Sequence, residues 1–159
     1  MLRKLLATQP RVSLLLLRLL LGGVMFPHGA QKALGWFGGF GLNATIQAFT
    51  THMGIPLVFA WLAVAAEFLG SLGLIFGLLT RVAAFGIGVV MVVAAVKVHM
   101  ANGFFMNWAK NQAGEGVEYH LLALAAALVL MIDGAGAASL DRALAGDHDG
   151  IAPARAAAL

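Results

Sequence analysis

Ionisable side chains lie inside or near the ends of long apolar runs in this 159-residue sequence. Such groups are costly to place in hydrocarbon, and they commonly mark a ligand site, a proton route or an ion pair. The first of them occur in the stretch Phe26-Pro27-His28-Gly29-Ala30-Gln31-Lys32. A helix puts His28, Gln31 and Lys32 on one face, because residues three and four positions apart are neighbours on a helix surface. The partners that later apolar runs can offer are Glu67, Lys97, His99, Glu118 and His120.

A ligand or proton site is the first possibility, and a quinone or a similar small molecule is one candidate ligand. A quinone headgroup needs hydrogen-bond donors at its carbonyl oxygens and a route for protons. His28, Lys97 or His120 can donate these hydrogen bonds, and Glu67 can relay protons. The apolar tail should lie at a mouth lined by Phe37, Phe104 and Trp108. We therefore assign the catalytic role to Glu67, His28 and His120. The expected binding residues are His28, Gln31, Lys32, Glu67, Lys97, His99, Glu118 and His120.

A haem or copper centre is a second possibility. Two histidines from different helices, such as His28 and His120, suit haem iron or copper. No local spacing marks a metal site, so we assign no residue as a metal ligand. The sequence has no cysteine, which excludes disulfides, thiolate catalysis and cysteine-ligated clusters within this chain.

A network of ion pairs without a ligand is the third possibility. In such a network Glu67 pairs with Lys97, and Glu118 pairs with Lys32, so that the charges hold neighbouring helices together. The chain would then be a non-catalytic scaffold, or a pathway for protons or small solutes, and the activity would belong to partner proteins.

Membrane helices are the elements expected to position these groups. The sequence is 61% hydrophobic and only 11% charged, whereas soluble domains carry about 25% charged residues. A hydrocarbon core of about 30 Å needs about 20 residues of helix. We therefore expect an all-α, integral membrane four-helix bundle in residues 1–144, followed by a flexible cytoplasmic tail at 145–159. The predicted helices span residues 12–34, 56–79, 81–100 and 117–138.

The distribution of basic residues predicts the orientation in the membrane. By the positive-inside rule, both termini and the connection between the second and third helices face the cytoplasm. We attribute the net charge of +3 to this topology rather than to nucleic-acid binding. The two long connections lie outside, each with a short interfacial helix or loop. The basic residues on the cytoplasmic side are Arg3, Lys4, Arg11, Arg81, Arg142 and Arg155, and only Lys110 is free in an outer loop.

Three further expectations concern the ends of the chain. The basic start followed by an apolar run resembles a signal peptide, but Arg18 interrupts the run and no small-x-small cleavage site follows, so we expect an uncleaved first helix. Arg18 should extend its charged end to the near interface. Asp141 and Arg142 should belong to a solvated tail.

The depth of the polar groups predicts a common chamber. At 1.5 Å per residue, Glu67 lies near the middle of its helix, and the other groups lie about 7–14 Å toward the outer face. The ionisable side chains of all four helices are therefore expected to converge in the outer half of the bundle. Lys97 and His99 point about 160° apart on a helix, so at most one of the two should reach the centre deeply.

Several short motifs occur in the order Arg18-Leu19, His28-Gly29-x-Gln31-Lys32, Gly35-Trp36-Phe37-Gly38-Gly39, Ala66-Glu67-Phe68-x-Gly70, Gly77-Leu78-Leu79-Thr80-Arg81, His99-x3-Gly103-Phe104-Phe105, Glu118-Tyr119 and Ser139-Leu140-Asp141. These motifs, between about residues 14 and 144, resemble those of the DoxX family. The resemblance implies a small, multi-pass, four-helix protein of the bacterial inner membrane.

The resemblance implies less about function. The family is named after the similar small subunit of a thiosulfate:quinone oxidoreductase, and relatives are linked to sulfur metabolism and oxidative stress. The chain would then be a membrane oxidoreductase or a subunit of one. Because it has no cysteine, sulfur chemistry would need a sulfur-bearing substrate or a partner chain. The expected partners are the lipid bilayer, an oxidoreductase or sulfurtransferase subunit and further copies of the chain, but not nucleic acid.

Overall fold

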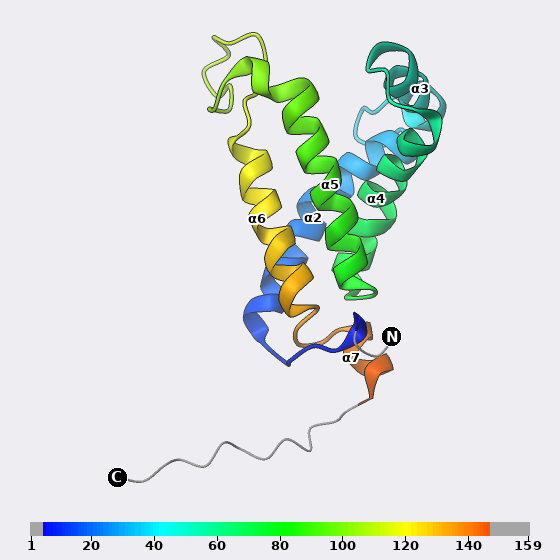
Figure 1. Ribbon diagram of the computed structural model, residues 1–159, viewed down its shortest axis with the longest axis vertical. Helices are drawn as coiled ribbons and strands as arrows, with labels where there is room; N and C mark the ends of the chain where they lie inside the picture. Colours follow the sequence, from blue (N-terminus) through cyan, green and yellow to red (C-terminus); the bar gives the residue numbers. More distant parts are fainter. Residues whose placement is uncertain (1–4, 147–159) are drawn as a thin grey trace.

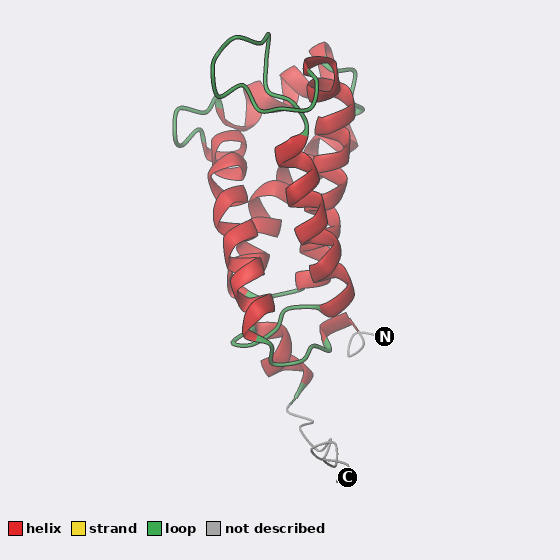
Figure 2. Cartoon of the chain, turned by 90° about the vertical axis from the view of Figure 1, so that its left-hand side faces the viewer, coloured by secondary structure: helices red, strands yellow, loops and turns green. Residues whose placement is uncertain are grey.

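The computed structural model describes residues 5–146, and within them every regular element is a helix and none is a strand (Figure 1, Figure 2). The predicted all-α class is confirmed for this range. The basic residues Arg3, Lys4 and Arg155 lie outside it, as does the predicted tail from residue 147 onward. The helices are α2 (Val12–Leu34), α3 (Gly41–Gln47), α4 (Leu57–Phe76), α5 (Thr80–Ala94), α6 (Glu118–Asp133) and α7 (Leu140–Ala145).

Three helical segments are long and apolar enough to cross a membrane: α2, α4 and the continuous run Thr80–Asn102. This last run consists of α5, a π-helical turn (Ala95–His99) and a 3-10 turn (Met100–Asn102). The helix α6 has 16 residues, so its length of about 24 Å is less than a hydrocarbon core of about 30 Å. Helix length and composition thus fit a helical membrane protein.

Glycines in the left-handed region determine where two of the helices end. The helix α4 stops at Phe76, before the predicted residue 79, because Gly77 adopts φ 66° and ψ 40°. The helix α6 stops at Asp133, before the predicted residue 138, and Gly134 follows with φ 83°. A positive φ is costly for residues with a side chain, so glycine at these positions ends each helix sharply.

The four longest helices, α2, α4, α5 and α6, lie side by side (Figure 1). The helix α4 packs against α2 and α5, and α6 packs mainly against α5. Their shared core includes the buried side chains of Met25, Leu74, Ile87 and Leu130. Large apolar side chains such as Leu122 also cover the outer faces of the helices. Such an apolar surface is suited to lipid rather than to water.

Arg18 is buried, so the prediction that it extends to the interface is wrong. Only 1% of it is exposed. Its guanidinium donates hydrogen bonds to carbonyl groups at the end of α4 and in the connection from α6 to α7, where the helices leave carbonyls unpaired. The acceptors are the carbonyl oxygens of Leu74 (2.9 Å), Ile75 (2.6 Å), Ala135 (3.0 Å), Ala137 (3.2 Å) and Ala138 (2.5 Å).

Asp141 is also buried, although it was predicted to lie in a solvated tail. Its carboxylate accepts hydrogen bonds from the backbone N–H groups of Leu79 (2.6 Å) and Thr80 (2.8 Å). These N–H groups lie at the start of α5, where the helix itself offers no acceptor. The carboxylate also attracts the positive charge of Arg18. The segment that holds α7 is therefore packed into the fold.

The opposite end of the molecule carries the two long connections (Figure 1). The first contains the short helix α3, which continues as a π-helical turn, Ala48–His52. The predicted short helix between the first two long helices is therefore present. The second connection, residues 103–117, is irregular.

Candidate functional site

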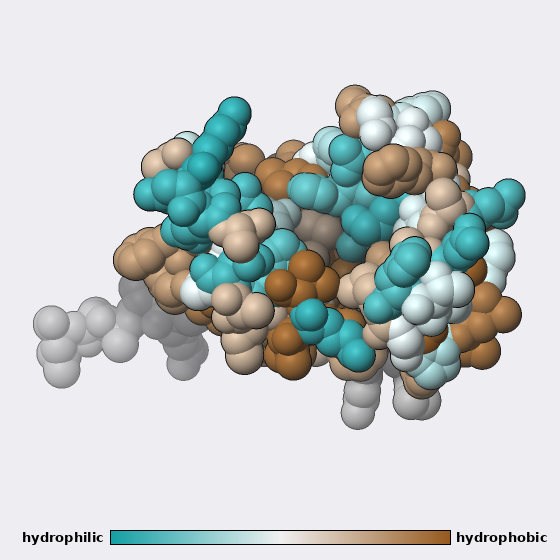
Figure 3. All heavy atoms as spheres, turned by 90° about the horizontal axis from the view of Figure 1, so that it is seen from above, coloured by the Kyte–Doolittle hydropathy of each residue, from teal (hydrophilic) through white to brown (hydrophobic). Residues whose placement is uncertain are grey.

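A cavity of about 1490 Å³ lies between α4 and α5 and reaches the end of the molecule beside α3 and residues 103–117. Its volume exceeds the range of about 300–1,000 Å³ that is usual for small-molecule sites. Figure 3, which looks onto this end, shows a hollow flanked by hydrophilic residues. Most of the wall is apolar and comes from α4 and α5. The ionisable lining residues are His28, Lys32, Glu67, Lys97, His99, Glu115, Tyr119 and His120.

Lys32 and Glu67 form an ion pair between α2 and α4. Lys32 Nζ lies 2.5 Å from Glu67 Oε2, and the Glu67 side chain is only 6% exposed. Gly29 allows this close approach, because a Cβ on it would lie 2.6 Å from the Cα and N atoms of Phe68. The absence of a side chain at Gly29 therefore brings the carboxylate within reach of the ammonium group.

Tyr119 connects the histidines of α2 and α6. Its ring centroid lies 6.2 Å from that of His28 and 5.4 Å from that of His120. Its hydroxyl donates a hydrogen bond to Met25 Sδ at 3.4 Å. The aromatic side chains of α2 and α6 thus form a connected row along one wall of the cavity.

His99 and His120 form a pair of rings between the end of α5 and the start of α6. Their centroids are 4.1 Å apart. His99 Nδ1 lies 2.8 Å from the Glu115 carbonyl oxygen, and because a carbonyl can only accept, Nδ1 carries the proton and Nε2 of the neutral ring is left as an acceptor. His120 is 6% exposed, and its Nδ1 makes no well-formed hydrogen bond, although the Gly116 carbonyl interacts with the ring.

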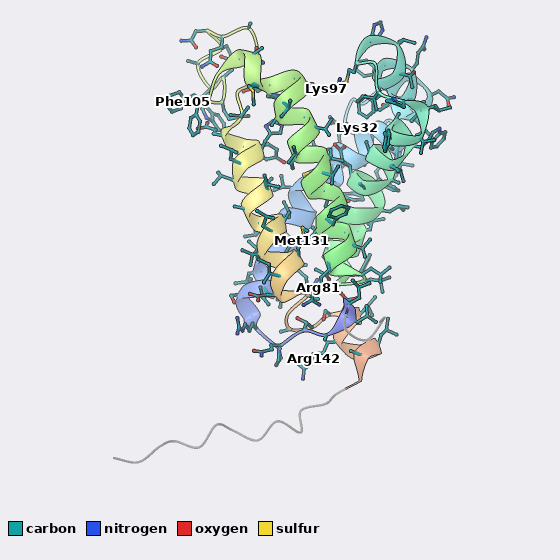
Figure 4. The ribbon with its side chains drawn as sticks, in the orientation of Figure 1. Lys32, Arg81, Lys97, Phe105, Met131 and Arg142 are labelled. Carbon is teal, nitrogen blue, oxygen red and sulfur yellow. The ribbon has the colours of Figure 1, made fainter. Side chains whose placement is uncertain are left out.

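Lys97 lies at the rim of the cavity, on the π-helical turn after α5. Figure 4 labels it near the same end of the molecule as Lys32. Its Nζ lies 3.4 Å from the Met53 carbonyl oxygen. Within residues 5–146 no carboxylate lies within ion-pair distance of it. Turns of π-helix often occur at functional sites.

Two of the predicted binding residues do not line the cavity, and neither do Phe37, Phe104 and Trp108, which were expected at its mouth. Gln31 Nε2 donates a hydrogen bond to the Phe37 carbonyl oxygen at 3.1 Å, which holds the turn after α2. Glu118 Oε1 accepts one from the backbone N–H of Met106 at 2.8 Å, which holds residues 103–117. Both side chains organise connections next to the cavity.

The ion pairs expected from the sequence are not the ones that form. Glu67 pairs with Lys32 rather than with Lys97, and Glu118 bonds to the backbone of its own connection. The reason is the close approach of α2 and α4, which the spacing of residues within one helix does not reveal. In the described part of the chain, no group of three or more His, Asp or Glu side chains could hold a metal ion.

Tyr119 and Glu115 line the cavity without having been predicted to do so. A signal for Tyr119 was available, because it is the only tyrosine in the sequence and stands between Glu118 and His120. Glu115 had no comparable signal, because it lies in an irregular connection whose path depends on tertiary contacts.

Comparison with known proteins identifies the family. The DoxX family model matches residues 13–100, which is more than half of the chain. The chain belongs to the DoxX family. An uncharacterized protein from Haemophilus influenzae is 33% identical to this DoxX protein over 136 residues, which are 82% of each chain. No solved structure matches this DoxX protein. The residues matched to the DoxX model include the lining residues from His28 to His99, whereas Tyr119 and His120 lie beyond them.

Proposed function

We propose that this DoxX protein crosses a bacterial inner membrane four times, with both termini in the cytoplasm. Three segments are long enough to span, and α6 runs alongside them. The segment before α2 and the helix α7 lie at the same end of the molecule (Figure 1), which supports an even number of crossings. Arg11, Arg81 and Arg142 belong to this end, as the positive-inside rule expects of a cytoplasmic face.

The proposed ligand of the cavity is a quinone or a similar molecule with a polar head and an apolar body. The observation that carries this proposal is the shape of the lining, in which a long apolar wall from α4 and α5 ends at a cluster of ionisable side chains. Apolar pockets with a few converging polar groups are typical ligand sites. A quinone has the same division into a polar ring and an apolar tail.

In this proposal the histidines hold the ring and the buried carboxylate handles protons. His28 and His120 are suited to donate hydrogen bonds to the carbonyl oxygens. Glu67 is suited to store and pass on a proton, because it is a buried carboxylate beside the cavity. Reduction of a quinone also needs electrons, which a partner oxidoreductase or sulfurtransferase subunit would supply. A role in sulfur metabolism or oxidative stress would follow from the identity of that partner.

A scaffold without a ligand is the second candidate, and one observation favours it. The Lys32–Glu67 pair joins α2 to α4 where Gly29 brings the backbones together, so this part of the network has a structural use of its own. In that case His28→Ala and Glu67→Gln would impair folding or assembly with partners without a separate chemical defect.

The test of the quinone proposal is direct. The protein is purified gently, its visible spectrum is recorded, and co-purifying small molecules are identified by mass spectrometry. We expect bound quinone, and we expect His28→Ala to weaken quinone binding while the fold is retained. A protein that neither retains nor binds any quinone would contradict the proposal. Catalysis by the isolated chain would exclude a pure scaffold.

A further inference from the structure

The two helices that form the apolar wall of the cavity pack closely from Gly73 of α4, where a Cβ would lie 3.3 Å from the Ala83 Cβ, up to Gly86 of α5. A Cβ on Gly86 of α5 would lie 3.0 Å from the Ala66 Cβ of α4. From this contact toward α3, the two helices separate (Figure 1). The cavity is lined by both helices along this stretch, so the separation is an opening and is not filled by side chains.

The facing sides of this opening are apolar on both helices. On each helix three apolar lining residues, Phe59, Leu62 and Ala63 on α4 and Val90, Val93 and Ala94 on α5, are three and four positions apart, which places them on one face. Phe59, Leu62 and Val93 are also exposed at the surface of the molecule. The opening therefore connects the cavity with the lipid-facing surface. Ala65 on α4 and Val89 and Met91 on α5 also line this stretch.

The lining continues past the contact as an apolar groove on the outer face of α4 and α5. Leu69, Phe76, Val82 and Phe85 line this part, and all four are exposed. From Phe59 to Phe76 the groove follows α4 for about 25 Å, at 1.5 Å per residue. That length extends along most of a hydrocarbon core of about 30 Å. The ionisable lining residues lie between Glu67, which is midway along α4, and the end of the cavity beside α3.

We infer that the opening between α4 and α5 is a lateral portal for the apolar tail of the ligand. The tail passes out of the cavity through this portal and lies in the groove along α4 and α5. The inference rests on the proposed quinone function and names the ligand class: a quinone with a long isoprenoid tail that enters from the bilayer. A water-soluble headgroup would occupy only the polar end, near Lys97 and the histidines, and would leave the groove unused.

The experiment narrows the portal without touching the polar end. Val93→Trp places a large ring in the opening. The matched control is Val92→Trp, since Val92 is the adjacent valine, is similarly exposed (45% against 37%) and does not line the cavity. Native mass spectrometry then measures binding of a benzoquinone with a long isoprenoid tail and of the same benzoquinone without a tail.

We expect Val93→Trp to weaken binding of the long-tailed quinone at least about tenfold, with the tail-less quinone and the Val92→Trp control unchanged. If Val93→Trp does not fold, Val93→Cys is folded first and then labelled with a bulky maleimide, because the chain has no other cysteine.

Each other outcome overturns the inference in a distinguishable way. If neither quinone binds the unmodified protein, the proposed function itself fails. If both quinones bind and Val93→Trp affects neither, or affects both equally, the quinone proposal stands and the portal is wrong. If Val93→Trp changes only the oligomeric state, measured by light scattering, a second copy of the chain covers the groove in place of a tail.

Discussion

At the scale of single residues, this chain stabilises its buried charges in two ways. Arg18 forms no ion pair with a carboxylate of residues 5–146 and donates hydrogen bonds to five backbone carbonyl groups. Lys32 and Glu67 form an ion pair across two helices. If one partner of such a contact is removed, the other is left buried without a hydrogen-bond or ion-pair partner, which lowers the stability of the fold.

Arg18→Leu should destabilise the protein strongly. The substitution leaves carbonyl groups at the end of α4 and after α6 without donors, and we expect a loss of about 3–5 kcal/mol. Thermal unfolding in detergent measures the effect. The control Arg11→Leu removes an exposed arginine whose nearest carboxylate, on Asp133, is 3.8 Å away, so it should change stability by less than about 1 kcal/mol. Equal effects of the two substitutions would contradict this account of Arg18.

A double-mutant cycle on Lys32 and Glu67 should show strong coupling. Glu67→Leu alone leaves the ammonium group without its partner, and Lys32→Met alone leaves a buried carboxylate, each at a cost of about 3 kcal/mol. The double variant should recover much of this loss in stability, because neither charge remains. If it recovers stability and yet fails to bind quinone, the pair has a role beyond packing. Additive losses would mean that the two groups do not stabilise one another.

At the scale of the elements, the site depends on how closely α2 approaches α4. The approach is closest at Gly29, one turn from Lys32 and level with Glu67. The π-helical turn after α5 carries Lys97 and His99 to the other side of the cavity. The polar end of the cavity is therefore built by one close contact and one change in helical winding.

Gly29→Ala should separate α2 from α4 and weaken the ion pair. The added methyl group would meet the Phe68 backbone at 2.6 Å, and such overpacking costs about 1–3 kcal/mol. Gly23→Ala is the matched control on the same helix, where a Cβ meets nothing within 4 Å. It should leave stability unchanged or raise it by up to about 1 kcal/mol, because alanine favours helix. Thermal unfolding of both variants measures these changes in stability. If Gly29→Ala does not lower the stability, the contact between α2 and α4 can relax.

At the scale of the whole molecule, the polar end of the cavity lies at the end opposite α7 (Figure 1). With the proposed orientation, this end faces away from the cytoplasm. A ligand would then be reached from the outer half of the bilayer, and its protons would exchange on the outer side through the connections next to the cavity.

Cysteine labelling tests this orientation without background, because the sequence has no cysteine. Ala109→Cys lies in the connection 103–117 and Ala143→Cys lies in α7, and both positions are exposed. A membrane-impermeant maleimide applied to intact spheroplasts should label Ala109→Cys and should leave Ala143→Cys unlabelled until the membrane is opened. The reverse pattern would invert the topology, and labelling of both from outside would contradict an even number of crossings.

The positions of the helices and the kind of protein followed from the sequence alone. Apolar runs of about 20 residues predict membrane helices because the bilayer core fixes the required length, and α2 begins and ends where its run predicted. Family motifs such as His28-Gly29-x-Gln31-Lys32 identified DoxX membership, which the family model confirms. The candidate site residues could be recognised in the sequence because ionisable side chains are costly in hydrocarbon.

Only the tertiary structure decided which of these residues meet. Glu67 pairs with Lys32 because Gly29 lets two backbones touch, and periodicity within a single helix contains no information about that distance. Arg18 is buried because carbonyl groups distant in the sequence converge on it. Gln31 and Glu118 bond to connections whose paths are set by the packed helices. The stretch from His28 to Lys32 therefore located one wall of the site, while its partners across the cavity depended on how the helices pack.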